Sequence, residues 1–369
     1  MADIRVEGVK RNSSGLLLMM LILLLFSIGF VTVMSVLSCS PTGNLKKQLF
    51  ISGAALAVFA VMSSGLLKAS YVDFFLKSKL PTVILVCTLL LTVYTFLFAE
   101  NVNGARRWIE VLGISVQSSE MLKVAVILYL SSFFANPRYA GNEKKRLAVV
   151  PCVLAVSFGA VLLQHDFSTA VLIGLIGYFM MLFAGFDRRY MLLIAVIGIA
   201  ISVIAILGAG YRQTRFYDFI TGKENYQSQW AIHAIENGGW LGCGWGAGTI
   251  KSRGVLPEAE TDFIFAVLAE EIGFLGVLIL ISLMMIIGGK ALFLADKVKN
   301  QPGRFFLVLG ITFSFLSQTL MNLAVVVGLL PTTGVPLPLF SQGGSSLLCT
   351  MFMMGLLVHI ARTAEENDG

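Results

Sequence analysis

The residue best placed for acid–base chemistry in this sequence is Asp262. It lies in the segment Leu256-Pro-Glu-Ala-Glu-Thr-Asp-Phe-Ile-Phe, immediately before a long apolar run. A carboxylate at the mouth of an apolar helix loses part of its water, which raises its pKa, while the helix N-terminus lowers it. The balance could leave a carboxylate that accepts a proton. Pro257 suits the first turn of a helix, so we expect a helix from there that carries Glu258 and Asp262 on one face.

Arginines gather in segments of the same kind, between apolar runs. Arg106 and Arg107 stand beside Trp108, and Arg212 and Arg215 open a long stretch that contains no apolar run. The forked guanidinium donors of the first pair could bind a pyrophosphate or a lipid head group. An interfacial anchor fits the same residues equally well, because tryptophan is enriched at the membrane–water boundary.

Charged side chains also stand inside or beside the apolar runs. Glu120 and Lys123 are spaced so that they share one helical face. Charges are costly at such positions, so we expect them to pair and to line a cavity. A structural ion pair and a substrate contact both fit this pair. Asp166 stands in a tight connection between two apolar runs, where we expect it to cap the next helix, although it could also reach a site.

Further polar residues precede the last apolar run. Gln318 and Asn322 share a helical face and are expected to be buried among helices. Ser345 lacks the Gly-x-Ser-x-Gly context of a serine nucleophile. We expect the small residues of this turn to cap the last helix and to line a cavity: Ser341, Gly343, Gly344, Ser345 and Ser346.

A membrane domain must position these segments. Hydrophobic residues make up 57% of the 369 residues and charged residues 13%, and the mean hydropathy is +0.84. A soluble domain of this size needs more charge to cover its surface. The fold class is therefore all-α, because backbone polar groups in lipid must be satisfied within each span. Apolar runs of roughly 20 residues predict a polytopic protein with about ten transmembrane helices, at residues 15–38, 48–67, 80–98, 119–135, 146–164, 167–186, 190–210, 262–288, 304–330 and 341–361.

Basic residues set the expected orientation. They are in excess on the loops that share a side with the N-terminus, which predicts that both termini are cytoplasmic. We expect a single transmembrane domain over residues 1–369, with cytoplasmic tails at 1–14 and 362–369. The net charge of +6 is then a topology signal and requires no nucleic-acid partner. The scattered histidines and cysteines predict no metal cluster.

A long extracytoplasmic loop, residues 211–261, is expected between spans 7 and 8. A loop of this length in a compact protein is usually functional. Its glycine-rich part, residues 238–248, is expected to form a flexible or re-entrant segment over the membrane. The outer face is therefore where we expect the chemistry.

Taken together, these segments resemble the SEDS family, which is named for shape, elongation, division and sporulation. The resemblance runs in the same order along the chain, from about residue 103 to residue 357. It rests on the combination of Gly104-Ala-Arg-Arg-Trp-Ile, the segment around Asp262, and Gly328-Leu-Leu-Pro to Gly343-Gly-Ser-Ser. The sequence departs from the family pattern at Glu260, where a histidine is common, and at Gln342, where a tyrosine is usual.

The resemblance implies a peptidoglycan glycosyltransferase that polymerises lipid II outside the cytoplasmic membrane. Its substrates would be lipid II and the nascent lipid-linked glycan strand. Its partners would be a class B penicillin-binding transpeptidase and other division or elongation membrane proteins. The resemblance also implies that Asp262 is the essential acid, and we infer that it acts as general base toward the acceptor's 4-hydroxyl. The candidates to neutralise the pyrophosphate, with or without a divalent cation such as Mg²⁺ or Mn²⁺, are Arg106, Arg107, Arg212 and Arg215.

Two other functions are compatible with these residues. A lipid II flippase would use buried charges such as Lys123, although the polar motifs gather on one face. A non-catalytic division scaffold would need no outer carboxylate. Within the family, the glutamine-rich stretch before Ala231 and the surroundings of Asp262 favour the division type. Gly334-Val-Pro-Leu-Pro favours the elongation type, and on balance we prefer division.

Overall fold

The computed structural model describes residues 13–40, 43–64, 69–100, 105–111, 114–140, 142–208, 210–221 and 226–366. The described residues form nine long apolar helices and one shorter apolar helix, α8 (Phe167–Phe183). Each of the ten predicted spans therefore contains a helix. The predicted polytopic, all-α class is therefore confirmed. Nine described helices are long and apolar enough to cross a membrane: α1 (Ser13–Cys39), α2 (Leu45–Ser63), α4 (Leu80–Phe98), α5 (Ser118–Ala135), α7 (Glu143–Leu163), α9 (Arg188–Leu207), α13 (Ile264–Lys297), α14 (Pro302–Val326) and α15 (Gly344–Glu366).

The spanning helices differ sharply in how much of their surface the protein covers. The most apolar stretch of α5 is 78% buried, whereas that of α9 is only 6% buried. Helix α5 packs against α4, α8 and α14, and α15 packs against α2. Glu120 and Lys123 belong to the buried helix α5, and Gln318 and Asn322 belong to the buried helix α14. Charges inside a membrane are tolerated in such protein-enclosed positions.

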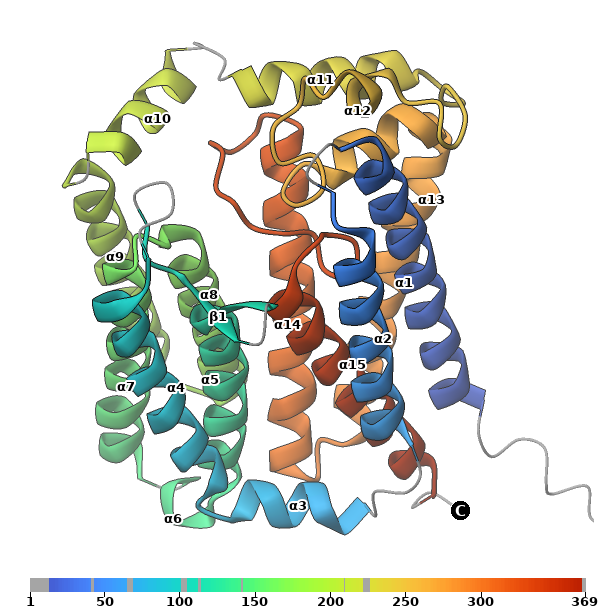
Figure 1. Cartoon of the computed structure of the whole chain (residues 1–369). Coiled ribbons are helices and arrows are strands. Elements are labelled where there is room, and N and C mark those ends of the chain that lie inside the picture. Colours follow the sequence, from blue (N-terminus) through green and yellow to red (C-terminus); the bar gives the residue numbers. More distant parts are fainter. Residues whose placement is uncertain are drawn as a thin grey trace, which may run out of the picture.

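Short helices lie across both ends of the bundle (Figure 1). One end carries α3 (Ala69–Lys77) and α6 (Pro137–Ala140), and both the start of α1 and the end of α15 lie at this end. The opposite end carries α10 (Gly210–Ile220), α11 (Tyr226–Gly238) and α12 (Thr249–Arg253). The predicted loop at 211–261 therefore crosses the end of the bundle largely as helices.

Several predicted boundaries move. The eighth span begins at Ile264 and reaches Lys297, and it is interrupted at Gly273, whose φ of 67° and ψ of −174° are not helical. The glycine-rich segment that was expected to be flexible or re-entrant is hydrogen-bonded through its backbone to this interruption. Helix α15 continues to Glu366, into the predicted C-terminal tail. Residues 1–12 and 367–369 of the predicted tails lie outside the described residues.

A two-stranded hairpin was not predicted. Strand β1 (Trp108–Val111) pairs antiparallel with β2 (Ile114–Gln117), with Trp108 opposite Gln117. The segment Trp-Ile-Glu-Val and the segment Ile-Ser-Val-Gln each place apolar residues at alternate positions, which is the period of a strand. This signal was available in the sequence. The hairpin leads directly into α5, and it carries Arg107 at its entrance.

Candidate active site

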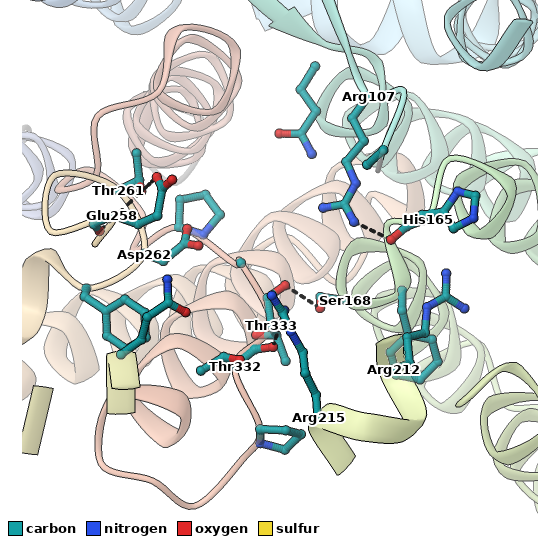
Figure 2. A pocket seen from close by; sticks show the side chains of 18 of the residues that line it. Arg107, His165, Ser168, Arg212, Arg215, Glu258, Thr261, Asp262, Thr332 and Thr333 are labelled. Carbon is teal, nitrogen blue, oxygen red and sulfur yellow. Dashed lines mark hydrogen bonds between the residues drawn. The ribbon is translucent and has the colours of Figure 1, made fainter. Parts of the chain in front are cut away.

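A cavity of about 610 Å³ lies at the end of the bundle that carries α10 and α11. Figure 2 shows two carboxylates, Glu258 and Asp262, on one wall and two arginines, Arg107 and Arg212, on the other. Arg215 reaches between these walls. The lining residues come from parts of the chain that are far apart in sequence. They include Arg107 and Gln117, His165 and Ser168, Arg212 and Arg215, Glu258 and Asp262, and Thr332, Thr333, Gly343 and Ser346.

Asp262 lies in a turn immediately before α13. The amides of Thr261 and Phe263 both donate to the carbonyl of Glu258, at 3.2 and 3.1 Å. Glu258 takes the left-handed conformation, with φ of 56°, which breaks any helix here. The prediction of a helix starting at Pro257, with Glu258 and Asp262 on one face, was therefore wrong. The turn still brings both carboxylates into the cavity lining.

The backbone of Asp262 is fixed from α14. Asn322 Nδ2 donates to the carbonyl of Asp262 and to that of Val335, both at 2.8 Å. Asn322 is buried and lies outside the cavity lining. It therefore contacts the backbone that carries the acid and the connection between α14 and α15, and not the cavity itself.

The protonation of Asp262 is shifted by its surroundings. The pKa of its carboxyl is raised to about 7; removal of water is the largest cause, and the negative charges of Glu258 and Asp166 act in the same direction. The positive charges of Arg107 and Arg215 lower the pKa, but less than these effects raise it. Because proton acceptors work best when their pKa is near the ambient pH, this carboxylate suits the role of a general base.

Three of the four candidate arginines line the cavity. Arg107 donates through Nη2 to the carbonyl of His165, and Arg215 Nη1 donates to the carbonyl of Thr332 at 3.1 Å. The guanidinium of Arg212 lies 5.7 Å from the centre of the Phe167 ring. Arg106 lies outside the lining, and its Nη1 donates to the carbonyl of Leu97 at 3.2 Å.

Asp166 caps a helix and lies behind the cavity lining, of which it is not a member. Its Oδ1 accepts from the amide of Thr169 at 3.2 Å, which caps α8 as predicted. Its Oδ2 accepts from Gln117 Nε2 at 2.8 Å and from Ser119 Oγ at 3.0 Å. The nearest guanidinium nitrogen of Arg107 is 3.9 Å away. Asp166 thus ties the hairpin and α5 to α8, and it supports Arg107 from behind.

Glu120 and Lys123 form an ion pair of 2.8 Å near the start of α5. Both are almost fully buried, and neither lines the cavity. Lys123 Nζ also donates to Gln318 Oε1 at 2.7 Å, and Gln318 Nε2 donates to the carbonyl of Pro336 at 2.9 Å. Of the two roles considered for this pair, the structure favours the structural one. This network fixes the connection between α14 and α15 through the carbonyl of Pro336.

The turn before α15 matches the expectation only in part, because two of its five candidate residues line the cavity and the hydroxyls of Ser341 and Ser345 bond to residues outside α15. Gly343 and Ser346 line the cavity, and α15 begins at Gly344. Ser341 Oγ accepts from the amide of Leu337 at 2.6 Å. Ser345 Oγ accepts from the amide of Gln117 at 2.9 Å, which joins this turn to the hairpin.

Two further lining residues, His165 and Ser168, were not predicted as site residues. His165 has a φ of 63°, and burial together with the charges of Arg212 and Arg107 lowers its pKa. Ser168 Oγ donates to the carbonyl of Thr333 at 2.8 Å. Their place in the cavity lining could not be predicted from the sequence, because it depends on the packing of α8 against α14.

Within the part of the chain that the structure describes, no three His, Cys, Asp or Glu side chains are grouped as metal ligands. The carboxylates in the cavity lining are Glu258 and Asp262. Mg²⁺ is commonly held by one or two carboxylates together with the phosphates of a substrate. The donors present therefore fit a cation that arrives with a pyrophosphate.

Comparisons with known proteins show which family this chain resembles in sequence. The sequence model of the FtsW/RodA/SpoVE family, described as "Cell cycle protein", matches residues 16–366. The chain is 33% identical to the probable peptidoglycan glycosyltransferase FtsW of Borreliella burgdorferi over 97% of this chain and 100% of that protein. It is 32% identical to the protein of the same name from Bacillus subtilis, over 94% of this chain and 88% of that protein.

Solved structures share the fold. Rod shape determining protein RodA of Thermus thermophilus matches with a TM-score of 0.66 and 23% identity, over 94% of this chain and 96% of that one. A chain from a structure described as "Structural coordination of polymerization and crosslinking by a peptidoglycan synthase complex" matches with a TM-score of 0.74 and 23% identity, over 94% and 97% of the two chains. The fold and the cavity define a polytopic membrane protein with an end-facing site. The chain belongs to the FtsW/RodA/SpoVE family, and the names of its relatives agree with the division type.

Proposed function

We propose that this protein is a peptidoglycan glycosyltransferase that polymerises lipid II into glycan strands, with Asp262 as its general base. The observation that carries the proposal is a carboxylate with a pKa near 7 that faces arginines across one cavity. The names of its relatives support the same reaction.

The proposed step is an inverting transfer. Asp262 accepts the proton of the acceptor sugar's 4-hydroxyl, and that oxygen forms a bond to the anomeric carbon of the lipid-linked strand. The bond from this carbon to the pyrophosphate oxygen breaks, and the lipid pyrophosphate leaves with the electron pair. Arg107, Arg212 and Arg215 stabilise the charge on the leaving group. Glu258 would hold a Mg²⁺ or Mn²⁺ ion that arrives with the pyrophosphate, and this ion would supply further neutralisation of the leaving group.

The cavity end is assigned to the outer face of the cytoplasmic membrane, with both termini in the cytoplasm. The excess of basic residues on the loops at the opposite end supports this orientation. A class B penicillin-binding transpeptidase is the proposed partner. Support comes from the synthase complex that shares the fold, whose description couples polymerization with crosslinking.

The test is reconstitution of the purified protein and its transpeptidase with lipid II in lipid vesicles. Glycan strands of many disaccharides are the expected product, separated by gel electrophoresis. Transbilayer movement of lipid II without polymer would instead support a flippase. If neither activity occurs and an Asp262→Asn variant still complements a deletion, the protein is a scaffold.

The rate of polymerisation should depend on pH near neutrality. The pKa of Asp262 is raised to about 7, and the base must be ionised to accept a proton. The value of kcat/KM should therefore rise between pH 6 and pH 8 and level off above that range. Initial rates of polymer formation over this range measure the midpoint.

Two variants should move this midpoint in opposite directions. Glu258→Gln removes a negative charge that raises the pKa of Asp262, so the midpoint should shift to lower pH. Arg215→Gln removes a positive charge that lowers this pKa, so the midpoint should shift to higher pH. Shifts of the same sign in both variants would contradict the assignment of the titrating group to Asp262.

A further inference from the structure

The interruption of α13 is repaired by another part of the chain. In an unbroken helix, the carbonyls of Glu270 and Glu271 would accept from the amides of Phe274 and Leu275. The non-helical conformation of Gly273 prevents these two hydrogen bonds. Residues 239–244, here called the glycine clip, form hydrogen bonds with the same carbonyls and amides instead. The exchanged bonds run from Cys243 N to Glu270 O (3.0 Å), Gly244 N to Glu271 O (3.1 Å), Phe274 N to Gly239 O (2.8 Å) and Leu275 N to Trp240 O (3.2 Å).

The contact between the glycine clip and α13 requires glycine on both sides. A Cβ at Gly273 would lie 2.2 Å from the amide nitrogen of Gly242, and a Cβ at Gly242 would lie 2.1 Å from the carbonyl oxygen of Glu271. Both glycines also have positive φ values, 67° and 79°. The approach is therefore backbone against backbone, which leaves little freedom in where the clip lies.

Next to the break, the carboxylates of Glu270 and Glu271 both contact residues of α12. Glu270 Oε1 accepts from the amide of Thr249 at 3.0 Å and from its hydroxyl at 2.7 Å, and Glu270 Oε2 accepts from the amide of Ile250 at 3.2 Å. Glu271 forms an ion pair with Lys251, whose Nζ also contacts Ser35 Oγ of α1 at 2.5 Å. Both glutamates and Lys251 are buried. The short helix is thus clamped to α13 and α1.

This clamp lies next to the candidate acid in the chain. Helix α12 ends at Arg253, and the turn that carries Asp262 follows within a few residues. Leu256, Ala259 and Phe263 of this turn are buried, and Gln342 N donates to the carbonyl of Glu260 at 2.7 Å. One end of the turn is therefore fixed by α12 and the other by the start of α13.

We propose that Glu270 and Glu271 are positioning residues, which set the place of Asp262 in the cavity by clamping α12 to the break in α13. The proposal rests on the proposed role of Asp262 as general base. Neither glutamate lines the cavity, so both act through the backbone that leads to the acid. A misplacement of about 1 Å can cost 10²-fold in rate when a reacting group must be aligned.

The test uses the full-length protein with its transpeptidase and lipid II. Glu271→Gln, Glu270→Gln and Lys251→Met should each lower kcat by about 10- to 100-fold while KM changes less than about twofold. The midpoint of the acid limb of the pH profile should shift to lower pH, because a displaced Asp262 regains water and its pKa falls. Glu236→Gln, an exposed carboxylate at the same end of the bundle, is the matched control and should behave as wild type.

The double variant Lys251→Met/Glu271→Gln should lose no more activity than either single variant, because both changes break the same ion pair between Lys251 and Glu271. Thr249→Val removes only the hydroxyl donor to Glu270, so it tests the same clamp if the charge variants fail to fold. It should lower kcat a few-fold at unchanged KM. A folded Glu271→Gln or Thr249→Val variant with wild-type kcat and pH profile overturns the proposal.

Asp262→Asn, measured in parallel, separates the two claims. If this variant polymerises lipid II normally, the base has been misassigned and the clamp has nothing to position. If Asp262→Asn is inactive while Glu271→Gln keeps its kcat, the base stands and the positioning role fails.

Discussion

Asp262→Asn is expected to lower the rate of glycan polymerisation by about 10²- to 10⁴-fold, which is the usual contribution of a general base. The amide keeps the size of the side chain but cannot accept the hydroxyl proton. Asn322 holds the backbone carbonyl of Asp262, which the substitution leaves in place. The variant should therefore fold and still bind lipid II. Polymer formation from lipid II and an apparent melting temperature in detergent measure the two properties.

Glu260→Gln supplies the matched control. Glu260 is a carboxylate in the same turn, and it lies outside the cavity lining. Its neutralisation should leave polymerisation close to the wild-type rate. Full activity of Asp262→Asn, or an equal loss in Glu260→Gln, would show that the turn and not this carboxylate matters.

Lys123→Met is expected to destabilise the protein by about 3–5 kcal/mol, because it leaves the buried carboxylate of Glu120 without its cation. The change also removes the donor to Gln318, whose amide holds the carbonyl of Pro336. A clearly lower apparent melting temperature in detergent is the expected result. The double variant Glu120→Gln/Lys123→Met should recover much of the loss, since it buries no unpaired charge.

An exposed pair of the same spacing provides the comparison. Lys299 and Asp296 form an ion pair of 3.2 Å in which both side chains are mostly exposed. Lys299→Met should change stability by less than about 1 kcal/mol. If Lys123→Met were as stable as the wild type but abolished transbilayer movement of lipid II, a transport role for Lys123 would replace the structural one.

Much of the fold could be predicted from the sequence, because a span needs only length and apolar composition. The break at Gly273 could not, since its carbonyls and amides are satisfied by the distant glycine clip. The start of α13 was misplaced for a related reason. Pro257 suits a helix start by local preference, but tertiary contacts of Glu260 and Asp262 hold this stretch as a turn.

The candidate site was predicted unevenly. Asp262 and Glu258 were found because carboxylates beside an apolar run are unusual. Arg106 and Arg107 could not be distinguished by residue type, and only the hairpin and its entrance place Arg107 in the cavity and Arg106 outside it. Asn322 was expected among buried helices, but its hydrogen bond to the backbone of Asp262 has no signature in the sequence.

Gln117 connects three distant parts of the chain. Its backbone amide donates to Ser345 Oγ at the start of α15, and its side-chain Nε2 donates to Asp166 Oδ2 at the start of α8. Contacts of such long sequence separation form late, because the intervening chain must first be synthesised and placed. During biogenesis, the wall behind Arg107 therefore remains incomplete until the last helix has inserted, and a nascent chain that lacks α15 has no finished substrate chamber.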